Sequence, residues 1–311
     1  MKIFVPPLKC QGIKTKLVPW IQDSVSLTSD TIWHEPFMGS GVVGFNVRPR
    51  RAVFSDTNPH IIRFYQALQE RSITPGIAQQ FLEEEGARLS EHGQAHYYAV
   101  RERFNTTQNP LDFLFLNRSC FNGIMRFNRK GAYNVPFGHK PERFAKAYIT
   151  KIVNQIDYVA KCCVEYDWRF VCQDFRTALA QTAFAQTNST SLIYCDPPYI
   201  GRHTDYYDSW SEADEQELFI LLCSTPASFL LSTWHSTKWR TNTALEKYAA
   251  QFTVAFREHF YHVGASENNR NAVVEALVGN CLKPRQNLVS AMAKTEAKTE
   301  NFEAQHVLDF A

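Results

Sequence analysis

Short apolar runs alternate with helical patterns over the first 70 residues of the chain. Residues 31–35 and 52–55 have the composition of short buried strands. Between and after them, residues 42–47 and 59–70 carry apolar side chains at helical spacing. The order of strand, glycine turn, helix, strand, acid and helix is typical of the opening of a doubly wound α/β sheet.

The pattern changes after residue 70. Residues 73–158 are polar and helical, except that 117–138 is rich in Asn, Arg, Gly and aromatic side chains. Strand character returns at 170–174 and at 191–195, the latter a clearly buried strand. Further along the chain, we expect a helix over 215–223, a strand over 227–232, and two strands of a closing hairpin over 253–263 and 271–278.

These elements predict an α/β fold in which one domain is interrupted by another. Residues 1–70 and 165–285 would form the discontinuous α/β domain, and 71–164 a mostly helical insert. Residues 286–311 are rich in Ala, Lys and Glu, and we interpret them as a loosely held tail.

Charge and composition exclude several classes of function. The 33 basic and 31 acidic residues give a net charge of +2, which excludes a uniformly basic nucleic-acid coat protein. Any nucleic-acid binding must therefore come from a local patch. No apolar run approaches the roughly 20 residues of a membrane span, and residues 1–10 do not resemble a secretory signal. We expect a soluble cytoplasmic protein.

The cysteine and histidine residues predict no metal site. None of the eight cysteines forms a C-x-x-C pair, so we expect free thiols. His92 and His96 have a spacing found among metal ligands, but no third ligand stands out.

Asp196-Pro-Pro-Tyr199 directly follows the buried strand at 191–195 and carries the most specific chemistry. The lone pair of an exocyclic base amine is delocalised into the ring, which makes methylation difficult. The Asp196 carboxylate and the Pro197 carbonyl can accept both amine hydrogens and turn the lone pair toward an incoming methyl group. Tyr199 offers a face on which an extruded base can stack. The alternative is a rigid turn in which Asp196 is only a cap.

A glycine turn, 35–41, follows the first strand and would let the backbone pass close to a ligand. Asp56 lies 17 residues beyond Gly39, where folds of this kind hold a ribose diol. Asp56 can equally cap the helix that begins near Asn58. Asp174 and Phe175 end a further strand, and together they can receive an adenine amine and cover its ring, although a surface Asp beside a core Phe is the simpler interpretation.

The segment 117–138 interleaves basic and aromatic residues. Residues 124–128 and 132–137 can pair as a hairpin around Arg129-Lys-Gly131. A two-stranded ribbon can enter the major groove, and Arg and Asn side chains read base edges there. The alternative is a solvated basic hairpin. The candidate DNA contacts are Arg118, Asn122, Arg126, Arg129, Lys130 and Asn134.

The sequence resembles the Dam-like adenine-N6 DNA methyltransferases, the alpha-ordered group. Seven segments agree in the right order: 7–14, 35–41, 55–59, 115–123, 131–138, 173–175 and 196–199. The resemblance implies a Rossmann-like, seven-stranded methyltransferase sheet with an inserted target-recognition domain that carries a β-hairpin. It implies S-adenosyl-L-methionine as the cofactor and double-stranded DNA as the substrate.

The resemblance also assigns roles to individual residues. Asp196, Pro197 and Tyr199 would form the amine-acceptor site, and Arg126 would be the best candidate for a base contact. The residues implied to bind the cofactor are Cys10, Lys14, Glu35, Phe37, Gly39, Ser40, Gly41, Asp56, Asp174 and Phe175. One departure concerns the pocket wall, because Cys10 stands where the family usually has tryptophan and Ile13 where it has a second glycine.

The most favoured function is adenine-N6 methylation of duplex DNA, as the modification half of a restriction system or as an orphan enzyme. A cognate restriction endonuclease is then a possible partner, and we expect a monomer. Methylation of RNA or of cytosine-N4 is the first alternative, since Asp-Pro-Pro-Tyr is compatible with any such amine. A catalytically silent, cofactor-sensing DNA-binding protein is the second.

Overall fold

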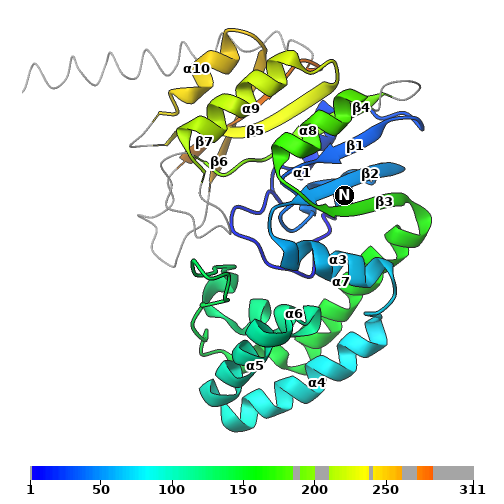
Figure 1. The fold of residues 1–311 in the computed structure, drawn as a ribbon, viewed down its shortest axis with the longest axis vertical. Helices are drawn as coiled ribbons and strands as arrows, with labels where there is room; N and C mark the ends of the chain where they lie inside the picture. The colour runs from blue at the N-terminus through cyan, green and yellow to red at the C-terminus, as the bar shows by residue number, and fades with distance from the viewer. Residues whose placement is uncertain (1, 185–189, 200–209, 238–240, 261–271, 283–311) are drawn as a thin grey trace, which may run out of the picture. The chain divides into compact units, whose positions relative to one another are not determined.

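A computed structural model describes residues 2–184, 190–199, 210–237, 241–260 and 272–282 of the chain (Figure 1). Its seven strands form one mixed sheet with the order β3-β2-β1-β4-β5-β7-β6, which confirms the α/β class. The chain divides into two compact units, Met1–Phe229 and Leu230–Ala311.

Four parallel strands form the sheet of the first unit. They are β1 (Ile32–Glu35), β2 (Arg51–Asp56), β3 (Asp167–Cys172) and β4 (Ser191–Cys195). β1 lies between β2 and β4, and all five residues of β4 are buried. The chain first moves from β1 outward to β3 and then returns to β4, so the strand order reverses between β1 and β4. Open α/β sheets bind ligands at the carboxyl ends of their strands at such a point.

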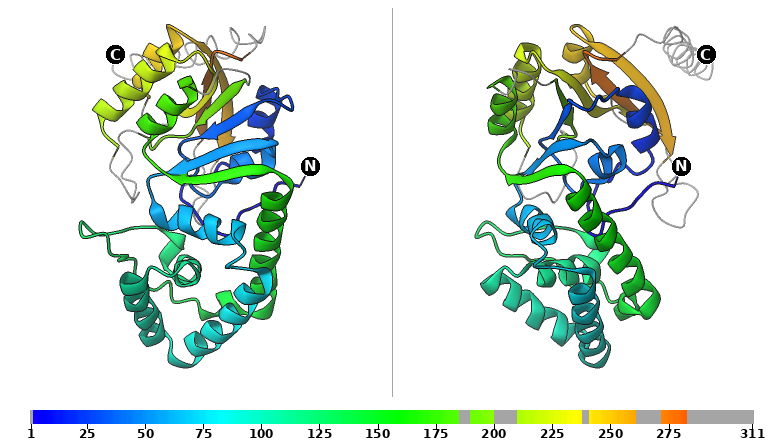
Figure 2. Two further views of the ribbon diagram at one scale, coloured as in Figure 1. Left: turned by 45° about the vertical axis from the view of Figure 1, so that its right-hand side comes forward. Right: turned by 90° about the vertical axis from the view of Figure 1, so that its right-hand side faces the viewer.

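Helices cover both faces of these parallel strands. They are α1 (Val18–Ser24), α2 (Val42–Val47), α3 (Pro59–Gln69), α8 (Phe175–Phe184) and α9 (Glu212–Ser224). Parallel crossovers are right-handed, so α2 and α8, whose crossovers run in opposite directions, lie on opposite faces (Figure 2).

The long crossover from α3 to β3 contains a layer of helices, as the polar helical pattern predicts. Its helices are α4 (Pro75–His92), α5 (Gln94–Thr107), α6 (Pro110–Ser119) and α7 (Lys146–Glu165), with short 3₁₀ turns at Phe121–Gly123 and Pro141–Phe144. Thr74 and Asn109 cap α4 and α6, and a proline follows each cap. α7 leads back from this layer to β3 (Figures 1 and 2).

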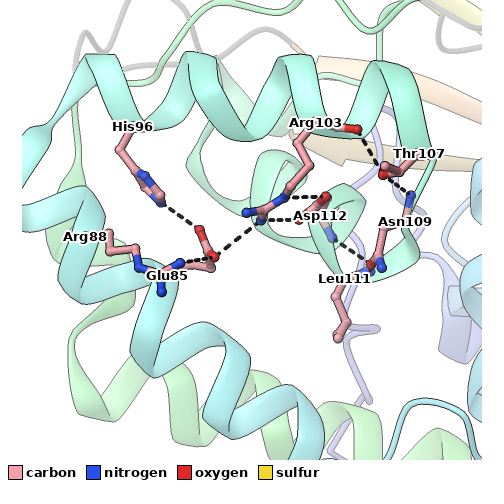
Figure 3. Close-up of polar contacts among 8 residues, drawn as sticks. All are labelled: Glu85, Arg88, His96, Arg103, Thr107, Asn109, Leu111 and Asp112. Atoms are coloured by element: carbon pink, nitrogen blue, oxygen red, sulfur yellow. Dashed lines mark hydrogen bonds and ion pairs between the residues drawn. The ribbon is translucent and has the colours of Figure 1, made fainter.

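A charged network holds three of these helices together (Figure 3). Glu85 of α4, only 3% exposed, accepts from His96 Nε2 at 2.7 Å and lies 3.3 Å from the Arg103 guanidinium, both on α5. Arg103 also donates through Nε to Asp112 of α6 at 2.9 Å. Arg88 brings a second guanidinium to Glu85 at 3.0 Å. The His96 side chain thus has the Glu85 carboxylate as a hydrogen-bond partner.

The second unit is antiparallel. β5 (Ser228–Thr237) pairs with β7 (Ala272–Gly279), which pairs with β6 (Thr253–Phe260), and α10 (Ala244–Ala249) packs on β6. The two predicted hairpin strands are confirmed over the described residues. β5 carries a register shift between Trp234 and Ser236.

Several elements differ from the prediction. β3 begins at Asp167 rather than 170, because the Asp167 amide pairs with Arg50 O at the start of β2. The sequence pattern gave no sign of α1, α8 or α10. The tail over 286–311 lies outside the described residues. So do residues 201–209 of the polar aromatic segment 201–210, whose sequence fits either a loop that folds over an extruded base or a plain surface loop. Among the described residues, no helix is both long and apolar enough to cross a membrane.

Candidate functional site

The glycine turn after β1 is tied to the end of β2. Gly39 and Gly41 have φ of +49° and +76°, a region that favours glycine. Gly39 N donates to Asp56 Oδ2 at 2.9 Å, and Met38 N donates to Ser55 O at 2.9 Å. The turn predicted to meet a ligand is therefore bonded to the end of β2 at two points.

Asp56 supports this turn and does not cap the next helix. Its second oxygen accepts the Asn58 amide at 2.9 Å. The cap of α3 is Asn58 itself, whose side chain accepts from His60 N at 3.0 Å. The simpler interpretation of Asp56, as a helix cap, is therefore wrong, and its carboxylate lies at the carboxyl end of β2.

Glu35 and Ser40 are the buried polar residues of the turn itself. Glu35 is 2% exposed and accepts from Trp33 Nε1 at 2.8 Å. Burial raises the pKa of Glu35 to about 8, so the carboxyl group is mostly protonated at neutral pH. Ser40 is also buried, and its carbonyl accepts from Tyr65 Oη at 2.6 Å. Both predicted cofactor residues thus support the turn from inside.

Asp174 and Phe175 come together with Phe37 at the next strand end. The rings of Phe37 and Phe175 stack with centroids 5.5 Å apart. Asp174 Oδ1 accepts the Arg176 amide at 2.8 Å, and Oδ2 lies 3.1 Å from the Arg176 guanidinium. The Asp174 side chain remains 40% exposed, so its carboxylate is accessible to a ligand.

The acceptor motif follows β4, the strand on the other side of β1. Lys14 Nζ lies 2.9 Å from Asp196 Oδ1 and 4.8 Å from the centroid of the Tyr199 ring. Lys14 is 5% exposed, and Pro197 is also buried. The resemblance implied that Lys14 serves the cofactor, whereas the structure joins it directly to the acceptor carboxylate.

Cys10 lies close to the glycine turn and to the carboxylates of Asp56 and Asp196. A Cβ added to Gly39 would be 3.3 Å from Cys10 Sγ. Burial, followed by the nearby Asp56 and Asp196 carboxylates, raises the pKa of the Cys10 thiol to about 12. The thiol is therefore protonated at neutral pH and is not an activated nucleophile.

Asn117 holds the segment that carries Cys10 and Lys14. Its side chain forms two hydrogen bonds with the backbone of Lys9, at 2.8 and 2.9 Å. Asn117 lies on α6 and is fully buried. This contact spans 108 residues of sequence, which is why local pattern gave no sign of it.

Within the basic segment 117–138, residues 117–119 end α6 and residues 120–138 form an antiparallel ribbon. Phe127 bridges Tyr133, and Asn128 N donates to Ala132 O at 2.9 Å. The predicted pairing is present, but as isolated bridges rather than two regular strands. Arg129 and Lys130 are exposed at the ribbon's tip.

The predicted DNA contacts lie on this ribbon, except Arg118, which lies on α6. Arg126 Nε donates to Asn134 Oδ1 at 2.9 Å across it, and both side chains are half-buried. Asn122 is exposed and has a φ of +53°. Arg118 does not fit its predicted role, because it is 8% exposed and donates to Gln155 of α7 at 2.7 Å. A buried guanidinium of α6 is not presented to a base edge.

α5 supports the ribbon from below. Asn105 accepts from Tyr133 N at 2.8 Å and donates to Tyr133 O at 3.2 Å. Tyr97 Oη donates to Val135 O at 2.8 Å. At the ribbon's base, a Cβ on Gly138 would lie 2.6 Å from Cys120 O, so only glycine fits there.

Sequence pattern predicted a cofactor role for neither Arg176 nor Trp210, which both lie beside Phe175. Arg176 contacts three carboxylates, and Trp210 contacts the rings of both Phe37 and Phe175. Their only sequence signal was proximity, since Arg176 follows Asp174-Phe175 and Trp210 ends a polar aromatic loop.

The residues at this sheet edge fit a nucleoside. A glycine turn, two carboxylates and an aromatic pair follow β1, β2 and β3, which are adjacent in the sheet. Carboxylates accept from ribose hydroxyls and from an exocyclic amine, and aromatic rings stack on a base. A second carboxylate site, Asp196 with Tyr199, follows β4. The arrangement therefore provides for a nucleoside cofactor and a separate amine side by side.

Comparison with known proteins agrees with this chemistry. The family described as D12 class N6 adenine-specific DNA methyltransferase matches residues 11–269. The type II methyltransferase M.FokI of Planomicrobium okeanokoites is 29% identical over 88% of the chain. The DNA adenine methylase of Serratia marcescens is 31% identical over 68% of the chain, and the modification methylase StsI of Streptococcus sanguinis is 27% identical over 90%.

The relatives differ in how much of their own length is matched. The chain spans 42% of M.FokI and 43% of StsI, but 75% of the Serratia enzyme.

Proposed function

The chain belongs to the D12 class of N6 adenine-specific DNA methyltransferases, and from that premise we propose that it methylates the N6 amine of an adenine extruded from duplex DNA. The observation that carries the proposal is the position of Asp196. Its carboxylate follows β4 at the point where the strand order reverses, next to the glycine turn of β1. Neighbouring strand ends can therefore hold the methyl donor and the acceptor together.

The residues of the acceptor motif act on the amine. Asp196 and the Pro197 carbonyl accept its two hydrogens, and Tyr199 stacks on the base. Lys14, 2.9 Å from Asp196, favours the ionised carboxylate that this role requires. S-adenosylmethionine supplies the electrophilic methyl group when bound. Positioning and polarisation account for the catalysis, with no covalent enzyme intermediate.

The cofactor role falls to the glycine turn, Asp56, Asp174, Phe37 and Phe175, with Cys10 and Lys14 at its border. Target recognition falls to the ribbon, through Arg126, Arg129, Lys130, Asn122 and Asn134. We infer that 71–164 is a target-recognition domain inserted into a catalytic domain of 1–70 and 165–285. We further place the protein in the cytoplasm as a monomer that modifies DNA for a restriction system.

Substitution of Asp196 by Asn tests the proposal. The variant keeps the size of the side chain but loses the charge, so methyl transfer to duplex DNA falls at least about 100-fold. Calorimetry with S-adenosylhomocysteine shows affinity close to that of the wild type, since Asp196 serves the amine. Asp30→Asn, at an exposed turn, is the matched control.

Substrate choice is tested with labelled cofactor. Duplex DNA, RNA of the same sequence and DNA with a single target cytosine are compared, and digestion to nucleosides identifies the product. N6-methyladenine from duplex DNA supports the proposal. Methylated RNA or N4-methylcytosine would instead support a methyltransferase with a different target. Binding without transfer would support the cofactor-sensing DNA-binding protein.

A further inference from the structure

Trp210 extends the aromatic pair at the predicted cofactor site. Its ring lies 5.5 Å from Phe37, edge-on at 81°, and 5.3 Å from Phe175, tilted at 55°. The three rings come from the end of β1, the start of α8 and the residue two positions before α9. Aromatic rings at these separations form one cluster, in which each touches the other two.

The Trp210 ring is held in place but only half-buried. Its indole Nε1 donates to Glu215 Oε2 at 3.1 Å, one turn into α9. The next residue, Ser211, closes a capping box with Asp214 that fixes the start of that helix. Trp20, Trp33, Trp168 and Trp234 are at most 6% exposed, so Trp210 differs from the other tryptophans that the structure describes.

Arg176, on α8, joins α8 to α9 through ion pairs. Its guanidinium donates to Asp214 at 2.6 Å and to Glu217 at 2.8 Å, both on α9. Its third contact is Asp174, at 3.1 Å. The guanidinium also lies 4.4 Å from the centre of the Phe175 ring. Because the planar group has fixed donor directions, these contacts determine how Asp174 and Phe175 are presented.

We propose that Trp210 is a third aromatic contact for the adenine ring of the cofactor, and that Arg176 is a positioning residue that aims Asp174 at the adenine amine. The inference rests on the proposed cofactor site at Phe37, Asp174 and Phe175. Trp210 presents an aromatic surface beside the faces that would cover the ring. The first turn of α9 thereby becomes part of the cofactor site, although the last of the seven segments that resemble the family ends at Tyr199.

Trp210 is tested by binding of S-adenosylhomocysteine, measured by calorimetry. Loss of one stacking contact costs about 1–3 kcal/mol, so Trp210→Ala weakens affinity roughly 5–150-fold. Trp210→Phe keeps an aromatic ring and most of the affinity. Ile220→Ala, an exposed apolar position on α9, is the control and binds normally. Equal affinity of Trp210→Ala and the wild type would overturn this role.

Fluorescence gives a second measurement that is independent of catalysis. Stacking of adenine near Trp210 quenches indole emission, so S-adenosylhomocysteine lowers the emission of the wild type but much less that of Trp210→Phe. An identical decrease in both proteins would place the ligand away from Trp210 and refute the contact.

Arg176 is tested by comparing Arg176→Met with Arg176→Lys. In Arg176→Met, KM for the cofactor rises about 10-fold, whereas kcat and KM for DNA stay close to wild type. The lysine variant recovers part of the loss, because it restores a cation beside Asp174. Arg169→Met, with an exposed side chain on β3, is the control. A fall in kcat alone, or no change, would overturn the positioning role.

A double-mutant cycle separates positioning from general destabilisation. If Arg176 acts through Asp174, Asp174→Asn/Arg176→Met binds S-adenosylhomocysteine about as weakly as either single variant. Additive losses would refute the link. Melting temperatures are recorded for each variant, and only folded protein is titrated. Failure of the wild type to bind S-adenosylhomocysteine would instead contradict the proposed function.

Discussion

Glu35 is a buried carboxyl group of the glycine turn. It lies against Gly44, where an added Cβ would be 2.5 Å from Glu35 Oε2, and it accepts from the Trp33 indole. Burial raises its pKa from 4.5 to about 8. Below pH 4.5 the group is protonated in both the folded and the unfolded chain, and its stabilising contribution is complete. The contribution is lost as the pH rises through 8.

Glu35→Gln removes this pH dependence. In the wild type, the free energy of unfolding declines between about pH 5 and 8 with a slope from this group that approaches ~1.4 kcal/mol per pH unit. Glutamine cannot ionise, so the variant gains stability relative to the wild type as the pH rises across that range. Urea titrations of both proteins at several pH values measure the difference. A difference that stays constant with pH would refute the buried protonated carboxyl.

Arg126 is the residue on which sequence readout is expected to depend. Its loss, in Arg126→Ala, costs roughly 1–3 kcal/mol of discrimination and relaxes preference at one position of the site. Methylation of the target and of each single-base variant, at two salt concentrations, measures the effect. A uniform loss across sequences, with a shallower salt dependence, would make Arg126 a phosphate contact instead.

The positions of single residues were predictable where a motif ends a strand, as for Asp196 and Asp56, whose roles toward the amine and the cofactor stay predictions. They were not predictable where the role depends on partners distant in sequence. Arg118 and Arg126 look alike in the sequence, yet one is buried against Gln155 and the other lies on the ribbon. Lys14 belongs to the amino-terminal segment by motif, but its partner, Asp196, lies across the site.

At the scale of elements, α5 connects the buried charges of the helical layer to the ribbon. His96 and Arg103 meet Glu85, whereas Tyr97 and Asn105 hold the ribbon backbone. The ribbon lacks regular strands of its own, so its position depends on this helix. Glu85 fixes α5 against α4, and thereby supports the predicted DNA-reading surface indirectly.

Glu85→Ala tests this support. Arg88 and Arg103 are 53% and 41% exposed, and Arg103 keeps Asp112, so removal of the buried carboxylate lowers the free energy of unfolding by about 1–3 kcal/mol. Urea denaturation gives the value. Glu84→Ala, an exposed neighbour on the same helix, changes stability by less than about 0.5 kcal/mol. A loss no larger than that of the control would mean that the network contributes nothing to stability.

Elements with strong periodicity or a buried apolar run were predicted well, as β4 and α3 show. α1 and α10 have only seven and six residues, too few for helical periodicity to be visible. The segment 175–184 was also missed, because its small and polar residues dilute the apolar pattern. The ribbon was predicted as two strands. Part of its backbone instead hydrogen-bonds to side chains of α5, and local sequence patterns do not reveal such distant partners.

At the scale of the whole molecule, the net charge of +2 is too small to hold DNA by itself. Exposed cations at the ribbon tip, Arg129 and Lys130, are expected to supply local attraction. Arg50 and Arg51 are also exposed and adjacent, but they lie at the amino end of β2, the edge of the sheet opposite the site. A comparison of the two pairs therefore distinguishes an effect of local charge at the ribbon tip from an effect of total charge.

Replacing Arg129 and Lys130 together by glutamine weakens DNA binding evenly across sequences. The slope of log affinity against log salt becomes shallower by up to about 2, one for each lost phosphate contact. The double variant of Arg50 and Arg51 removes the same net charge and keeps both slope and affinity. Titrations with labelled duplex at several salt concentrations measure this. Equal effects in the two variants would refute a localised DNA surface.

The separation of neighbouring strands along the chain also determines how the protein must fold. Thr31, beside β1, meets Thr190, beside β4, across 159 residues, and β2 meets β3 across a similar helical detour. Such pairings have a high entropic cost of closure and form slowly. During synthesis at roughly 5–20 residues per second, the edge of β1 that pairs with β4 stays unpaired for on the order of ten seconds or more. The nascent chain therefore exposes an unpaired apolar strand edge, so a pause in translation before residue 191 would favour aggregation over assembly of the sheet.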